Sequence, residues 1–248
     1  MSISILICFI SGIFWAFFDL TRKLSLKYIH PRVLLILLML IQALIFFFWC
    51  IKESFSFDII SYFLPGIFSV LTGVIAALIF LKSLKESEIS LTIPLLSLSP
   101  LFSSLFSWIF LGEALSLLQY IGIFIIITGI LILYSEKLQL LYFLKSVINI
   151  KDNKSVKLMT IVAFLWSLTP VLDKMCLQHS SINIHGLVQA ICIFGILFFF
   201  SKKELKVLKN LNKTNLILIF ITVSIGASAI ILQFFSITMT YVPIMESI

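Results

Sequence analysis

The stretch from Ser90 to Tyr134 decides the fold, and it reads SLTIPLLSLSPLFSSLFSWIFLGEALSLLQYIGIFIIITGILILY. It holds two apolar runs on either side of Gly112-Glu113. Each run is close to the roughly 20 residues that an α-helix needs to cross a bilayer. Pro94 and Pro100 each remove one backbone hydrogen bond from the first run, which loosens that helix. The stretch therefore predicts two membrane-crossing helices, the first of them irregular.

Serines gather in the first of these runs, where Ser103 and Ser107 share one helical face with Pro100. Small residues let membrane helices pack closely. Hydroxyl groups also satisfy freed backbone groups and suit the wall of a water-filled cavity. Both interpretations stay open, and we take Ser97, Ser103 and Ser107 as cavity candidates, with Pro94 as well as Pro100 as structural residues.

The composition extends the membrane assignment to the whole chain. Of its 248 residues, 61% are hydrophobic and 12% are charged, and the mean hydropathy is +1.19. A soluble domain is usually about half apolar and about a quarter charged. So few charges cannot cover a water-facing surface, which excludes a soluble protein. The net charge of +7 does not indicate nucleic-acid binding, because the lysines lie in short clusters between apolar runs.

Eight apolar runs are long enough to cross a membrane, and a ninth begins near Tyr241 and reaches Ile248. No basic residue precedes the first run and no small-residue cleavage site follows it, which favours a membrane helix over a signal peptide. The fold predicted is an all-α integral membrane protein. The eight runs are Ile3–Leu20, Val33–Ile51, Ile60–Leu81, Leu91–Leu111, Leu117–Tyr134, Leu158–Leu172, Ile184–Phe200 and Leu216–Thr238.

The basic residues predict how the chain crosses the membrane. Of 18 lysines and arginines, 16 fall in the first, third, fifth and seventh loops, and only Lys52 and Lys174 fall on the other side. Cytoplasmic loops retain Lys and Arg. We therefore expect an external N-terminus and a multi-pass protein of a bacterial-type inner membrane.

An internal repeat relates the two parts of the chain. With an offset of 151 residues Trp15 aligns with Trp166, and with an offset of 153 Gly73 aligns with Gly226. The repeating unit has five helices, so the second copy enters the membrane from the opposite side. Inverted repeats of this kind are typical of secondary transporters.

The repeat predicts three parts of the chain. Residues 1–134 form a first five-helix repeat, residues 135–157 a basic cytoplasmic linker, and residues 158–248 an incomplete second repeat. Ile248 aligns with Leu95, so we expect about 39 further residues, enough for the rest of helix nine and helix ten.

The features of residues 90–134 identify a family. The run Pro94 to Pro100, the helix end Leu111-Gly112-Glu113 and the following Gln119, Gly122 and Gly129 resemble EamA-type members of the drug/metabolite transporter superfamily. The likeness covers the first 134 residues well and residues 158–248 more faintly. It implies ten helices in two inverted halves, with helices one, three, four, six, eight and nine around a substrate cavity.

Two small groups of residues near the second apolar run have structural interpretations. Gly112 and Glu113 lie in a short loop, where Glu113 can cap the following helix, since negative charge is favourable at a helix N-terminus. Gly122 and Gly129 are seven residues apart on one face, which favours close helix packing.

Charged residues in the spans give further candidates, because a charge at mid-bilayer costs about 2.5–3.5 kcal/mol. Asp19 and Lys23 are four residues apart and can pair on one face. Asp173 and Lys174 end the sixth span, where we expect them to extend toward the interface. Glu246 falls about one turn inside the ninth span and is the best single candidate for a cavity group.

The remaining cavity candidates are uncharged. Trp15 and Trp166 are equivalent across the repeat, on helices that the resemblance places at the cavity, and an indole can pack against an apolar or cationic solute. An interfacial position is the alternative. Gln233 is the glutamine expected to face the cavity.

The function expected is gradient-driven or exchange transport of a small organic metabolite. Alternatives from other classes are a lipid-modifying membrane enzyme and a non-transporting accessory subunit, although the paired catalytic groups of an enzyme are missing from the sequence pattern. We expect no catalytic residues, no cofactor and no metal site. The partners expected are a small solute and the lipid bilayer, with no nucleic acid and with a homodimer left open.

Overall fold

A computed structural model describes residues 3–86, 93–133 and 154–248. These residues are almost entirely helical, and the one β-type contact among them is an isolated bridge between Phe57 and Ser180. The prediction of an all-α fold is therefore confirmed. The helices are α1 (Ile3–Ser25), α2 (Pro31–Lys52), α3 (Ile59–Glu86), η1 (Ile93–Leu98), α5 (Ser99–Leu111), α6 (Leu117–Leu133), α8 (Lys154–Leu177), α9 (Ile182–Ser201), η2 (Glu204–Asn210), α10 (Lys213–Met239) and α11 (Val242–Glu246).

In the described part of the chain, seven helical segments are long and apolar enough to cross a membrane, counting η1 and α5 together as Ile93–Leu111. The fifth predicted span corresponds to α6, whose apolar part is shorter. Several helices extend beyond their predicted ends, among them α1 to Ser25, α3 to Glu86 and α8 to Leu177. These extensions change the surroundings of several charged side chains. Most of the expected linker, residues 134–153, lies outside the described residues, and α8 begins at Lys154.

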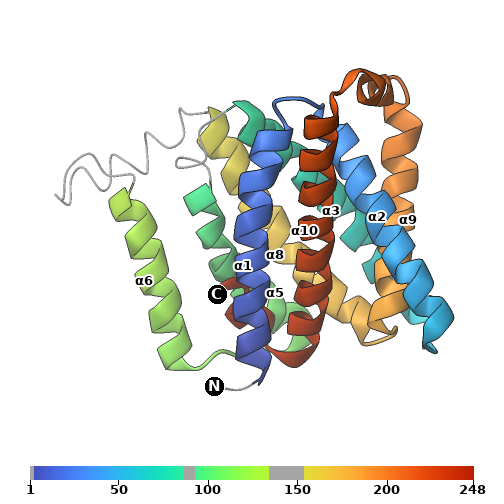
Figure 1. Cartoon of the computed structure of the whole chain (residues 1–248). Coiled ribbons are helices and arrows are strands. Elements are labelled where there is room, and N and C mark those ends of the chain that lie inside the picture. The colour runs from blue at the N-terminus through green and yellow to red at the C-terminus, as the bar shows by residue number, and fades with distance from the viewer. Residues whose placement is uncertain (1–2, 87–92, 134–153) are drawn as a thin grey trace.

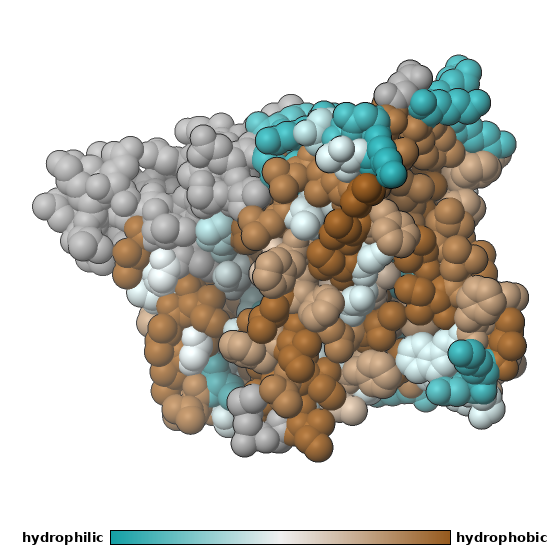
Figure 2. Space-filling view, in the orientation of Figure 1, coloured by the Kyte–Doolittle hydropathy of each residue, from teal (hydrophilic) through white to brown (hydrophobic). Residues whose placement is uncertain are grey.

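Successive helices run in alternating directions between two ends of the bundle (Figure 1). One end carries the turns at residues 26–30 and 202–212, and we call it the basic end. The non-basic end carries the turns at residues 53–58, 112–116, 178–181 and 240–241. α1 runs toward the basic end and α8 runs away from it. Hydrophilic residues gather at both ends, and hydrophobic residues form a belt between them, as lipid requires (Figure 2).

Proline and glycine shape the fourth span. Pro94 lies in the 3₁₀ segment η1, and Pro100 lies in the first turn of α5, where a missing N–H leaves no intrahelical bond unmade. Gly112 ends α5 with a positive φ of 68°, a conformation that glycine adopts without strain. Its N–H group donates to the carbonyl oxygens of Ser107 and Trp108. The span is therefore irregular at its start and sharply ended.

The main packing partners pair an early helix with a late one: α1 packs on α10, α2 on α9, and α3 on α8. Gly226 allows α10 to approach closely, because a Cβ atom there would lie 2.6 Å from the Phe18 ring and 2.9 Å from Leu38. The described core is apolar along these contacts and includes Phe80 and Leu34. The bundle thus depends on contacts between the two parts of the chain, not on contacts within each.

We predict that the basic end faces the cytoplasm. In a protein whose four cysteines are replaced by alanine, cysteine at exposed Ser54 should react with a membrane-impermeant maleimide in intact cells. Cysteine at exposed Asn212, at the basic end, should react only after lysis. The reverse labelling pattern would contradict the orientation.

Candidate functional site

A cavity of about 640 Å³ lies among α1, α2, α3, η1, the start of α5, α8, α9, α10 and α11. Its volume falls in the range of about 300–1,000 Å³ that small-molecule sites have. Most of its lining is apolar. Polar and charged side chains reach it from several helices, namely Ser11, Asp19, Arg22, Ser97, Ser99, Thr169, Asp173, Gln189, Gln233 and Glu246.

Six of the eight residues that the sequence singled out for a cavity line this one: Trp15, Asp19, Ser97, Trp166, Gln233 and Glu246. Ser103 and Ser107 are buried but are not part of its lining. The Ser103 hydroxyl donates to the Pro100 carbonyl at 3.3 Å, and the Ser107 hydroxyl donates to Glu113 at 2.5 Å. Their hydroxyl groups serve α5 and the turn after it, so these two serines have structural roles.

Asp19 forms an ion pair with Arg22, three residues later on the same face of α1. The Lys23 amine donates to the Leu84 carbonyl at the end of α3. Arg22 is 4% exposed and belongs to the cavity wall. Sequence reasoning placed Arg22 in a loop because it ended the first span at Leu20. One further turn of α1 carries the guanidinium group into the bundle.

Four aromatic rings surround the Arg22 guanidinium group. Its Cζ atom lies 3.9 Å from the ring centroid of Phe80, 4.8 Å from Phe18, 5.8 Å from Trp166 and 5.9 Å from Trp15. Contacts of this kind stabilise a desolvated cation. Its Nε atom has no hydrogen-bond partner in the described part of the chain. The two tryptophans aligned by the 151-residue offset therefore lie at one cation, from α1 and from α8.

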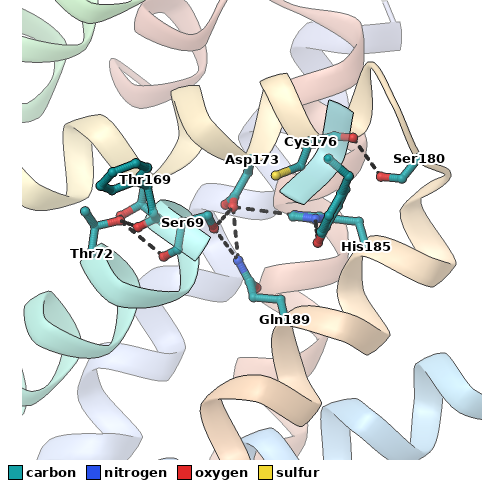
Figure 3. Close-up of polar contacts among 10 residues, drawn as sticks. Ser69, Thr72, Thr169, Asp173, Cys176, Ser180, His185 and Gln189 are labelled. Atoms are coloured by element: carbon teal, nitrogen blue, oxygen red, sulfur yellow. Dashed lines mark hydrogen bonds and ion pairs between the residues drawn. The ribbon is translucent and has the colours of Figure 1, made fainter. Parts of the chain in front are cut away.

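A second buried cluster joins α3, α8 and α9 near the non-basic end (Figure 3). Asp173 is 4% exposed and accepts hydrogen bonds from Ser69 and from the Gln189 amide, the latter at 3.0 Å. His185 Nε2 lies 3.5 Å from the same carboxylate oxygen. The prediction that Asp173 extends toward the interface is wrong, because α8 continues to Leu177 and packs this side chain against α3 and α9.

The Lys174 side chain is half-buried and does not extend outward. Its amine lies 2.5 Å from Glu113 Oε1 and donates to the Thr240 carbonyl at 2.6 Å. The side chains are 17% and 8% exposed, so the pair is shielded from water. The interfacial position predicted for Lys174 is therefore wrong for the same reason: α8 extends beyond Leu172.

The sequence suggested that Glu113 caps α6, but in the structure Glu113 does not do so. Its carboxylate accepts from the backbone N–H of Val242 at 3.0 Å, so it caps α11 instead. α6 is capped by Ser116 and Gln119, since the Gln119 side chain accepts from the Ser116 N–H at 2.7 Å. The Gly112-Glu113 turn thus connects α5 to a helix more than a hundred residues later.

The two glycines of α6 do not have the packing role predicted for them. No atom of the described residues lies within 4 Å of a Cβ atom added at Gly122 or Gly129. Gly122 borders a smaller cavity of about 200 Å³ that also touches Pro243 and Ile244 of α11. The glycine face of α6 is therefore open in this structure.

Glu246 ends the short helix α11 and lines the central cavity beside Met245 and Ile248. Glutamine residues Gln189 and Gln233 reach the cavity from α9 and α10. The site therefore combines one aromatic-enclosed arginine with carboxylates from α1, α8 and α11. Among the described residues, no group of His, Cys, Asp and Glu is arranged to hold a metal ion.

An apolar helical bundle with a partly polar central cavity defines a multi-pass membrane protein built to handle a small molecule. Residues 2–135, more than half of the chain, match the EamA-like transporter family. The chain belongs to this family, whose members are membrane transporters of the drug/metabolite superfamily. No curated protein matches the chain.

We predict that the Glu113–Lys174 pair stabilises the fold. Removing one member of a buried pair costs about 3–5 kcal/mol because the other charge is left without a partner. Lys174→Met should lower the apparent Tm in detergent by on the order of 10 °C. Lys52→Met is the matched control, since Lys52 is the exposed lysine near the same end. An equal Tm for the two variants would contradict this role.

Proposed function

We propose that this protein is a secondary transporter of a small organic solute in the plasma membrane, and that the central cavity binds the solute. The observation that carries the proposal is the Arg22 guanidinium group, which is buried, enclosed by aromatic rings and part of the cavity wall. A buried arginine with an unpartnered Nε suits a bound carboxylate, because guanidinium and carboxylate form paired, charge-assisted hydrogen bonds.

The solute that fits this chemistry is an amphipathic zwitterion, such as a hydrophobic amino acid. Its carboxylate would bind Arg22, its apolar side would pack on Trp15 and Trp166, and its ammonium group would find carboxylates in the same cavity. Asp19 already pairs with Arg22, so the cationic end of the solute falls to Asp173 or Glu246.

An inverted repeat gives such a cavity a way to alternate its access. Three observations support an inverted repeat in this chain. α1 and α8 run in opposite directions. In the proposed repeat, α1, α2 and α3 correspond to α8, α9 and α10. Exchanging the two halves then turns the packing pair α1–α10 into α3–α8 and leaves the pair α2–α9 unchanged. The family match over residues 2–135 also ends within one residue of the expected first repeat.

The first test compares three solutes with the same phenyl ring. L-phenylalanine carries both charges, phenylpropionate only the carboxylate, and phenethylamine only the ammonium group. In proteoliposomes, Arg22→Gln should lower L-phenylalanine counterflow by roughly tenfold or more, because a hydrogen bond to a charged group contributes about 1.5–3 kcal/mol. Phenethylamine entry should change much less.

Arg32→Gln is the matched control, because Arg32 is the other arginine of the chain and pairs with Glu204 at the basic end. Its counterflow should equal that of the parent protein. No counterflow of any of the three solutes by the parent protein would contradict the solute class. Equal loss of L-phenylalanine counterflow in Arg22→Gln and Arg32→Gln would show that Arg22 does not bind the solute.

A second prediction concerns Glu246. Its carboxylate lines the cavity, so Glu246→Gln should lower L-phenylalanine counterflow several-fold while membrane abundance stays the same. Glu86→Gln changes an exposed glutamate at the basic end of α3 and serves as the control. Unchanged counterflow in Glu246→Gln would show that this carboxylate does not contact the solute.

A further inference from the structure

Five side chains from three helices form a continuous polar path in the wall of the cavity. The order is Tyr62 on α3, His185 on α9 and Asp173 on α8, with Ser69 and Gln189 on the far side of the carboxylate. All five are less than a tenth exposed, and His185 is 0% exposed. Figure 3 shows Asp173 between Ser69 and Gln189 on one side and His185 on the other.

The hydrogen bonds along this path depend on which nitrogen of His185 carries the proton. The Tyr62 hydroxyl lies 2.9 Å from His185 Nδ1, and His185 Nε2 has no hydrogen-bond partner among the described residues but lies 3.5 Å from Asp173 Oδ1. Ser69 and Gln189 both donate to that same oxygen. If Tyr62 donates to Nδ1, the ring proton sits on Nε2 and points at the carboxylate. The Asp173–His185 pair then carries one negative charge.

The described residues place no lysine or arginine in direct contact with that charge. Within the described residues, no lysine or arginine lies within 4 Å of Asp173, and the neighbouring Lys174 forms its ion pair with Glu113. The groups that face the pair are Tyr62 and Ser69 from α3, Cys176 from α8, Gln189 from α9 and the Phe234 ring from α10. Asp19, Arg22 and Glu246 line the same cavity as Asp173. One added proton would make the pair neutral, either as a carboxylic acid with imidazole or as a carboxylate with imidazolium.

We infer that Asp173 and His185 together form a proton-binding site, and that a proton bound there is coupled to solute movement. Asp173 and Gln189 line the cavity, whereas His185 and Tyr62 lie behind them, so a proton can enter the pair from cavity water. The coupling follows from Asp173 Oδ1, which accepts bonds from α3 and α9. Protonation weakens these charge-assisted bonds and loosens the contact of three helices at one wall. The coupling rests on the proposed transport function, but the proton site does not.

The proton site is tested without any solute. Infrared difference spectra of the full chain in lipid, between about pH 5 and about pH 9, should contain a signal from the Asp173 carboxyl group, either a C=O band or a shifted carboxylate band, together with imidazole bands. Asp173→Asn should remove that signal, whereas Glu246→Gln should keep it. His185→Gln and Tyr62→Phe should keep it but shift the pH at which it appears, because each changes the partner of the shared proton.

Asp58→Asn is the control for this measurement. Asp58 is an aspartate at the same end, and hydrogen bonds from the Ser61 side chain and backbone hold its pKa below the usual value. It therefore stays ionised throughout the pH window, and its removal should leave the signal unchanged. If Asp173→Asn removes no carboxyl signal, or if His185→Gln does not shift the pH at which the Asp173 signal appears, the shared site is overturned.

Coupling is tested with L-phenylalanine in proteoliposomes. A pH gradient should stimulate uptake several-fold in the parent protein. His185→Gln changes a residue behind the cavity wall, so it should retain counterflow at equal pH on both sides but lose the stimulation at the pH that stimulates the parent protein. Stimulation that survives unchanged in His185→Gln would overturn the coupling. Absence of counterflow in the parent protein would contradict the proposed function, while the infrared result still decides the proton site.

Discussion

A charge in hydrocarbon persists only where a partner, a hydrogen-bond donor or water stabilises it, and this constraint organises the interior of the protein. Three charged side chains are buried among the described residues: Arg22, Glu113 and Asp173. Each is stabilised by groups from another helix or turn. Arg22 has aromatic rings from α3 and α8, Glu113 has Lys174 and the start of α11, and Asp173 has donors from α3 and α9. The buried charges therefore connect elements that are distant in the sequence.

These connections also explain why the polar groups of the cavity stay in place. An apolar helix can rotate or slide in lipid without much loss, since lipid tails and leucine side chains are similarly apolar. A helix that carries a charge with directional partners cannot rotate or slide without breaking those contacts. Lys174 bonds at once to Glu113 and to the Thr240 carbonyl, which fixes α8 against the turns that precede α6 and α11. The rotation of α8 about its axis is thereby set, and with it the direction of Trp166 and Asp173 toward the cavity.

The fold and much of the cavity could be predicted from the sequence, because apolar run length and lysine position carry that information. Trp15, Ser97, Gln233 and Glu246 were found from their positions in spans and in the repeat. Arg22 and Asp173 were not, because their helices extend about a turn past the apolar runs that predicted them. His185 lies inside a predicted span, but its position alone does not reveal its contacts with Tyr62 and Asp173. A charged residue at the end of an apolar run looks like a loop residue until its tertiary partners are known. Tyr62 forms a hydrogen bond with His185, and Ser69 donates one to Asp173. Both lie on α3, more than a hundred residues before their partners.

The two ends of the bundle are held by contacts of different strength. The non-basic end has the shielded Glu113–Lys174 pair. It also has backbone hydrogen bonds between residues 53–58 and 178–181, one of which the Asp58 N–H donates to the His179 carbonyl at 2.9 Å. At the basic end, Ser25 and Thr222 share a neutral hydrogen bond of 2.9 Å, and the Arg32–Glu204 pair is partly exposed. Breaking an exposed pair costs about 0–1 kcal/mol, whereas breaking a shielded pair costs more because it leaves a buried charge without a partner. Opening at the non-basic end therefore requires the larger disruption. A ligand or proton that promotes it must act on the helices that carry these contacts, and α8 carries both Lys174 and, one residue before it, Asp173.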